Sequence, residues 1–208
     1  MVKKHKSKKS NKINKLKKDL LTLPNLITGI RILSVPFVLI LIYINTPFTR
    51  LSALVLYILA IITDYLDGYI ARTYGVISVT GKLLDPLADK FIVILTFILL
   101  VSMNEVSVLP IILLLSREFY IFGIRNIAME HGEVIPAGMS GKIKTTLQML
   151  SVSFYIINSA VLSEYGIEFN SSLTASLMLW ISLVFSYYSA FRYSDKLRRK
   201  LFGNKDDR

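Results

Sequence analysis

Four aspartates stand close together in a chain that is otherwise poor in acidic residues. Residues 64–89 hold four of the 14 acids, with Asp64 and Asp67 three positions apart and Asp85 and Asp89 four apart. A helix turns about 100° per residue, so each pair lies on one helix face. Converging carboxylates repel one another, and a divalent cation relieves that repulsion. The spacing therefore predicts an oxygen-ligated site for one or two Mg²⁺ or Mn²⁺ ions.

Small and basic residues share these two helix faces. Gly68, Ala71 and Arg72 follow the first pair of aspartates, and Gly81 precedes the second pair. Glycines allow a helix or a ligand to approach closely, and a guanidinium can bridge phosphate oxygens. A single aspartate near a helix end is usually a solvated cap, but four on two faces within apolar segments favour a functional site.

The residue types that other metal sites and covalent nucleophiles require are rare or missing in this chain. It contains no cysteine and only two histidines, His5 and His131. Disulfides, thiolate metal sites and cysteine nucleophiles are therefore excluded, and a histidine-bound zinc ion is not expected.

Six apolar segments would position the acidic residues. The 208 residues are 53% hydrophobic and 19% charged, which is more apolar than a typical soluble domain. Each segment is near the roughly 20 residues that a bilayer requires, and helices satisfy the backbone there. We therefore predict an all-α, polytopic membrane protein with six transmembrane helices, at Leu26–Ile44, Leu51–Ala71, Leu83–Met103, Val108–Met129, Ile143–Leu162 and Leu173–Phe191.

The short link between the second and third segments makes them antiparallel neighbours, so both acidic faces can converge at one membrane surface. Basic residues predict which surface this is. The loops on the opposite side hold a single basic residue, Arg50, whereas this side holds both Lys/Arg-rich ends together with Arg72, Lys82, Arg125 and Lys142. The positive-inside rule therefore places both termini and the acidic site on the cytoplasmic side.

The ends of the chain differ in composition from its middle. We expect a polybasic cytoplasmic tail at residues 1–21, a membrane domain at residues 22–193 and a charged cytoplasmic tail at residues 194–208. The net charge of +11 is concentrated in the first tail, where nine of the first eighteen residues are lysines. That layout is typical of a segment facing anionic membrane lipid, so nucleic acid is not expected as a partner.

A second polar group lies in the fourth and fifth segments. Arg117 stands beside Glu118 inside an apolar run, and Arg125 lies within about 80° of Arg117 on the helix. Lys142 and Lys144 precede the body of the fifth segment. Arg117 could be a buried structural partner of Glu118, and the lysines could be interfacial residues. Taken together, the four cations could instead form an anion pocket for a phosphorylated substrate.

The acidic pattern resembles the signature of the CDP-alcohol phosphatidyltransferase family. The chain reads D-x2-D-G-x2-A-R-x8-G-x3-D-x3-D from Asp64 to Asp89, without departure from that signature. The resemblance implies a six-helix bundle, usually a homodimer, that transfers a phosphatidyl group from a CDP-linked lipid to an alcohol and releases CMP. It also implies that Asp64, Asp67 and Asp85 hold the metal ions, with Asp89 as a further ligand or the catalytic base.

The resemblance extends to the two substrates. It implies that Gly68, Ala71, Arg72 and Gly81 lie against the CDP group. The opening Leu23-Pro24-Asn25-Leu26-Ile27-Thr28…Arg31 and the string R-E…R…G-K-x-K-T-T-x-Q-M are similar to the glycerol-phosphate branch of the family. Asn25, Thr28 and Arg31 would then face the nucleotide, and Arg117, Arg125, Lys142 and Lys144 the acceptor phosphate.

The implied reaction converts CDP-diacylglycerol and sn-glycerol 3-phosphate to phosphatidylglycerophosphate and CMP, at a bacterial plasma membrane. Rival hypotheses within the family are a cardiolipin synthase, which would accept phosphatidylglycerol, and an inositol-phosphate transferase. A cation-coupled transporter is a rival of another class, but residues 108–192 contain no second copy of the acidic segment.

Overall fold

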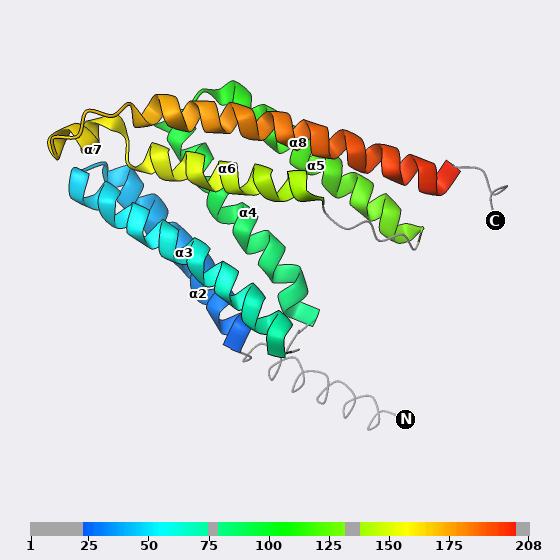
Figure 1. Cartoon of the computed structure of the whole chain (residues 1–208). Coiled ribbons are helices and arrows are strands. Elements are labelled where there is room, and N and C mark those ends of the chain that lie inside the picture. Colours follow the sequence, from blue (N-terminus) through cyan, green and yellow to red (C-terminus); the bar gives the residue numbers. More distant parts are fainter. Residues whose placement is uncertain (1–22, 75–78, 132–137, 203–208) are drawn as a thin grey trace, which may run out of the picture. The chain divides into compact units, whose positions relative to one another are not determined.

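The computed structural model describes the backbone of residues 23–74, 79–131 and 138–202, and the side chains of residues 29–63, 90–131 and 138–200. All regular secondary structure in these ranges is helical, which confirms the all-α prediction there (Figure 1). The helices are α2 (Leu23–Ile44), α3 (Pro47–Tyr74), α4 (Val79–Ser102), α5 (Val108–Glu130), α6 (Met139–Ile156), α7 (Ser159–Glu164) and α8 (Ser171–Phe202). The chain divides into two compact units, Met1–Thr96 and Phe97–Arg208, each described here by itself.

Five of the six predicted segments coincide with one long helix each, but the fifth does not. The predicted helix Ile143–Leu162 is α6 followed by the separate short helix α7. Asn158 starts α7 as its N-cap, because its side-chain oxygen accepts a hydrogen bond of 3.1 Å from the backbone N–H of Val161. Asparagine is a favoured N-cap, and this cap interrupts an apolar run that hydropathy alone treats as continuous.

One helix among the described residues is long and apolar enough to cross a bilayer, at Ser171–Lys200 within α8. Shorter apolar stretches lie at Gly29–Ile44, Pro47–Thr63 and Lys90–Ser102, and each is bounded at one of its two ends by residues whose side chains are not described. The number of spans therefore stays a prediction.

In the first unit, α2 and α3 form an antiparallel hairpin. The buried residues recur at intervals of three and four, which places them on one face of each helix: Val35, Val38 and Ile42 on α2, and Ala53, Tyr57 and Ala60 on α3. Asn45 makes the turn with a φ of 59°, a left-handed conformation that asparagine tolerates. Arg50, which the sequence placed in a loop, is buried in the first turn of α3 and donates from Nε to Asn45 Oδ1 at 2.9 Å.

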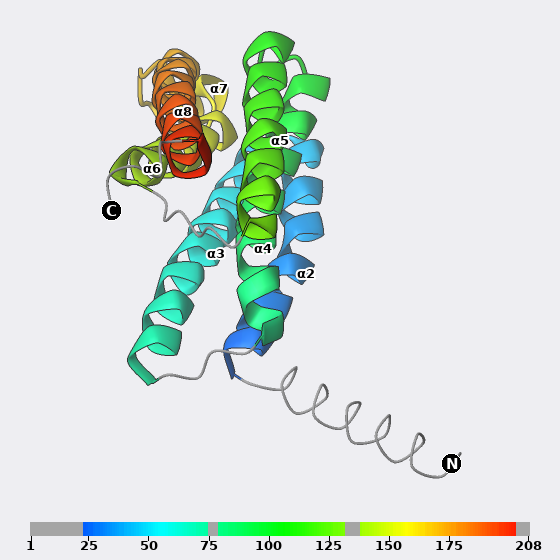
Figure 2. The same cartoon turned by 90° about the vertical axis from the view of Figure 1, so that its right-hand side faces the viewer.

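In the second unit, α6 and α8 lie side by side (Figures 1 and 2), and Figure 1 shows that they run antiparallel. Small residues allow the close approach. Ser151 Oγ of α6 donates to the carbonyl of Ala175 at 2.7 Å, and a Cβ at Gly141 would lie 3.8 Å from Ser189 Oγ. The contact therefore runs along most of α6.

Helix α5 packs parallel to α8. Tyr187 Oη donates to the Leu113 carbonyl at 3.1 Å, and Tyr120 Oη and Ser194 Oγ lie 3.0 Å apart about two turns further along both helices. Helix α8 continues to Phe202, past the predicted end near Phe191, so the first part of the charged C-terminal tail is helical.

Gly166 ends α7 in a left-handed conformation with a φ of 74°. Its N–H donates to the Ser163 carbonyl and that of Ile167 to the Leu162 carbonyl, both at 3.0 Å, the hydrogen bonds of a Schellman motif. Gly166→Ala is expected to lower the free energy of unfolding by about 1 kcal/mol, because a Cβ disfavours this conformation. Thermal unfolding in detergent measures the effect. In Gly123→Ala, the control within α5, an added Cβ meets nothing within 4 Å, so equal losses in the two variants would contradict the explanation.

Candidate active site

The four predicted metal ligands fall on helical backbone. Asp64 and Asp67 belong to α3, and Asp85 and Asp89 belong to α4, so helical periodicity keeps each pair on one face. Their side chains lie outside the described residues, as do those of Gly68, Ala71, Arg72 and Gly81. Among the side chains that the structure describes, no three acidic or histidine residues gather as a metal site. The metal site within residues 64–89 stays a prediction from the sequence.

The residues predicted to face the nucleotide are on α2. Asn25 and Thr28 lie in its first turns, with side chains outside the described residues. Arg31 is 3% exposed and continues the buried row of Val35 and Val38 that faces α3. Burying a guanidinium costs free energy unless hydrogen-bond acceptors or anions compensate it, so a buried arginine on this face is consistent with a polar role for Arg31.

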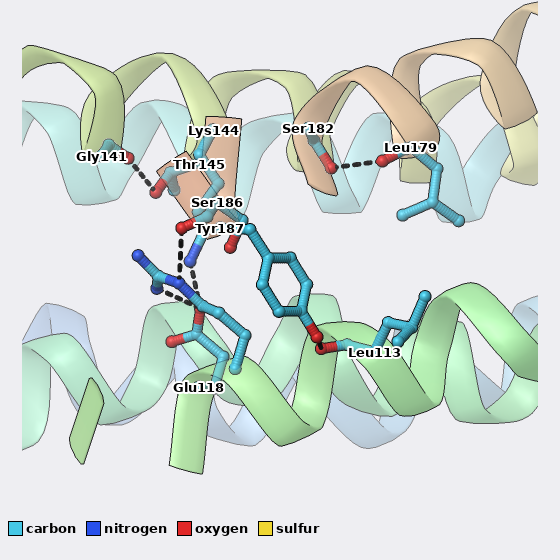
Figure 3. A network of polar contacts seen from close by, with 10 residues as sticks. Leu113, Glu118, Gly141, Lys144, Thr145, Leu179, Ser182, Ser186 and Tyr187 are labelled. Carbon is cyan, nitrogen blue, oxygen red and sulfur yellow. Dashed lines mark hydrogen bonds and ion pairs between the residues drawn. The ribbon is translucent and has the colours of Figure 1, made fainter. Parts of the chain in front are cut away.

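The predicted acceptor residues include two that share one carboxylate. Glu118 Oε1 accepts from Arg117 Nη1 at 2.9 Å and from Lys144 Nζ (Figure 3). Arg117 Nε also donates to the Ser186 carbonyl at 3.0 Å. Arg117 and Glu118 belong to α5, Lys144 to α6 and Ser186 to α8, so the ion triad links α5 to α6, and the hydrogen bond to the Ser186 carbonyl adds α8. The triad is defined here as Arg117, Glu118 and Lys144.

All three charges of the triad are withdrawn from solvent. The side chains are 7% exposed for Arg117, 11% for Glu118 and 8% for Lys144. The pairing of Arg117 with Glu118 matches the structural alternative considered from the sequence, while the part of Lys144 was not foreseen. Coulomb interactions are strong where water is scarce, so the shared carboxylate holds both cations firmly at this place. The triad thus brings two of the predicted acceptor-binding cations together.

The other two predicted cations have different surroundings. The Arg125 guanidinium lies two turns along α5 from Arg117, acts on it by charge repulsion, and stands over the ring of Tyr193 at 5.8 Å from the centroid. Lys142 is exposed on α6 and joins no ion pair with any described side chain. The structure thus brings Arg117 and Lys144 together and puts Arg125 on the same helix as Arg117, while Lys142 is exposed.

Two buried polar residues were missed by the sequence prediction. Gln148 Nε2 and Ser186 Oγ have no hydrogen-bond partner among the described residues. Gln148 lies one helical turn from Lys144, so the helical spacing within its motif could have identified it. Ser186 had no such signal, because it contributes to the site from α8. Buried polar atoms are normally paired, which makes these two candidates for contact with a polar ligand.

Comparison with known proteins identifies similar sequences. Residues 21–188 match the profile of the family described as CDP-alcohol phosphatidyltransferase. A CDP-diacylglycerol–glycerol-3-phosphate 3-phosphatidyltransferase of Rickettsia bellii is 34% identical over 171 residues, covering 82% of this chain and 92% of its own. Proteins of the same name from Rickettsia typhi and Bacillus subtilis are similar as well. The former is 35% identical, covering 82% of this chain and 94% of its own, and the latter 34%, covering 84% and 94%.

Proposed function

Because the chain belongs to the CDP-alcohol phosphatidyltransferase family, a family of membrane-bound enzymes, we propose that it synthesises phosphatidylglycerophosphate. The substrates would be CDP-diacylglycerol and sn-glycerol 3-phosphate, and the products phosphatidylglycerophosphate and CMP. The names of the relatives suggest this acceptor. The structural observation that supports it is the buried triad of Arg117, Glu118 and Lys144, which brings together two of the four cations predicted to bind a phosphorylated acceptor.

Asp64, Asp67, Asp85 and Asp89 would hold a divalent metal, with one or two Mg²⁺ or Mn²⁺ ions as the proposed occupants. The donor set fits such ions, because it consists of carboxylates alone and the chain contains no cysteine. When bound, the metal would neutralise the diphosphate and stabilise departing CMP. Gly68, Ala71, Arg72 and Gly81, with Asn25, Thr28 and Arg31 of α2, would bind the CDP group.

The proposed chemistry is a displacement at phosphorus. The hydroxyl oxygen of glycerol 3-phosphate bonds to the phosphorus that carries diacylglycerol, and the bond from that phosphorus to the bridging oxygen breaks. CMP leaves with the bridging oxygen. Asp89 would accept the hydroxyl proton, a task that a positioned carboxylate can perform. Positioning and charge neutralisation matter more than covalent help in such a transfer.

Arg117, Arg125, Lys142 and Lys144 would bind the acceptor phosphate. Arg125→Ala and Lys142→Ala are each expected to raise the KM for glycerol 3-phosphate about tenfold, the effect of losing one charge-assisted hydrogen bond, and to leave the KM for CDP-diacylglycerol within about twofold. Steady-state rates with either substrate varied measure this. Arg198→Ala is the matched control, since Arg198 is an exposed cation paired with Asp195. Equal rises in both KM values would contradict a separate acceptor pocket.

We also propose the membrane arrangement inferred from the sequence: six spans, both termini cytoplasmic, in the plasma membrane of a bacterium. The relatives are bacterial, and in the second unit α5 runs parallel to α8 while α6 runs antiparallel, as alternating spans require. The polybasic residues 1–21 would contact anionic lipid, and the protein would act as a homodimer, as the family resemblance implies.

A further inference from the structure

Helix α8 extends beyond the part of the chain that matches the family. The match ends at residue 188, whereas α8 continues to Phe202. Residues 189–202, called the α8 extension below, were expected from their charge to belong largely to a tail. Their contacts show a different arrangement, because one face of this segment packs on the last turns of α5.

An apolar cluster and a hydrogen bond join the α8 extension to α5. Ala128 and Leu197 are buried against each other, 1% and 7% exposed, with Ile124 and Tyr193 packed beside them. The Tyr120 hydroxyl and Ser194 Oγ lie within hydrogen-bond distance at 3.0 Å. Intervals of three and four residues on both helices keep all these groups on facing sides. The extension thus fixes the end of α5 that carries Arg125.

Tyr193 of the α8 extension also meets Arg125 directly. The guanidinium carbon lies 5.8 Å from the centre of the ring, within the range of a cation–π interaction. Arg125 is otherwise exposed, and a long exposed side chain loses rotamer freedom when it binds a ligand. The Tyr193 ring lowers that entropic cost, because it already restricts the Arg125 side chain before a ligand binds.

We propose that Tyr193 is a positioning residue for Arg125 and thereby a determinant of acceptor affinity, an inference that rests on the proposed function. Tyr193 would not touch either substrate. It would hold Arg125 in the orientation that meets the acceptor phosphate, while Ala128 and Leu197 keep the ring in place. Acceptor binding would thus depend on a segment outside the family match.

Tyr193→Leu removes the aromatic ring that Arg125 contacts, but it keeps an apolar side chain packed on Ala128 and Leu197. Tyr193→Phe keeps both the ring and the apolar packing. The full-length protein in detergent is assayed for CMP release with glycerol 3-phosphate or CDP-diacylglycerol varied. Tyr193→Leu is expected to raise the KM for glycerol 3-phosphate about two- to fivefold, the size of an exposed cation–π contact. Tyr193→Phe should behave as the unmodified protein. Tyr188→Leu is the matched control, because Tyr188 holds Arg192 in the same way at 5.9 Å and Arg192 is not a proposed site residue.

A double-mutant cycle with Arg125→Ala tests whether Tyr193 acts through Arg125. No further rise in KM from Tyr193→Leu in that background supports the proposal, whereas additive effects overturn it. Equal changes in both KM values, or the same change in Tyr193→Phe, also overturn it. If the unmodified protein releases no CMP with glycerol 3-phosphate, the proposed function itself fails and takes this inference with it. Normal release with an unchanged KM in Tyr193→Leu defeats only the positioning role.

Discussion

Replacement of Asp89 by asparagine is expected to lower the kcat for CMP release by about 10²–10⁴-fold, the range that one positioned proton acceptor supplies. Asparagine preserves the size and much of the shape of the side chain. It cannot take a proton from the acceptor hydroxyl, and it brings no negative charge to a metal ion. Loss of activity is therefore expected whether Asp89 acts as base or as ligand.

The Asp89→Asn measurement requires protein that is still folded. Thermal unfolding of the purified variant in detergent should give a midpoint close to that of the unmodified protein. Glu164→Gln is the control, since Glu164 is an exposed acid at the end of α7 and should tolerate loss of charge without loss of turnover. A kcat for Asp89→Asn within tenfold of normal, in folded protein, would remove Asp89 from both proposed roles.

Replacement of Glu118 by alanine is expected to lower the free energy of unfolding by about 3–5 kcal/mol, because it leaves two buried cations without their shared carboxylate. Arg117 and Lys144 would then repel each other at the junction of α5, α6 and α8. Denaturant titration of the purified protein in mixed micelles measures the change. Replacing Lys144 by methionine in the same variant should recover part of the loss, since it removes one of the stranded charges.

Asp195 provides the matched control for Glu118. It also holds two cations on one carboxylate, Arg198 at 3.3 Å and Arg199 at 2.8 Å, but those side chains are 76% and 78% exposed. Asp195→Ala is therefore expected to cost at most about 1 kcal/mol, as exposed ion pairs do. A similar cost for Glu118→Ala and Asp195→Ala would mean that the triad contributes no more than a surface pair.

Local patterns in the sequence predicted much of the fold. Long apolar runs predicted the positions of α2, α3, α4, α5 and α8, because a run of this length forms a single helix. The break between α6 and α7 was missed, since one capping side chain, Asn158, outweighs the hydropathy of its neighbours. The length of α8 was underestimated, because its last residues are mostly charged and were assigned to a tail. Leu197, which lies among them, packs against Ala128 of α5.

In the candidate site as well, features within one helix could be predicted from the sequence, and contacts between helices could not. The acidic motif could be recognised from spacing alone, because both members of each pair belong to one helix. The pairing of Glu118 with Lys144, 26 residues away, could not, because it depends on the register of α5 against α6. The same holds for Tyr193 and Arg125, which meet only once α5 and α8 are packed in parallel.

CMP release by the purified protein tests the central claim most directly. CDP-diacylglycerol is supplied with Mg²⁺ or Mn²⁺, with a chelator, and with or without sn-glycerol 3-phosphate. The proposed function predicts release that requires both the metal and glycerol 3-phosphate, with the glycerol 3-phosphate recovered in phosphatidylglycerophosphate. Metal-dependent release with phosphatidylglycerol or inositol phosphate instead would contradict glycerol 3-phosphate as the acceptor. Release that persists in the chelator would contradict the metal-binding role of the four aspartates.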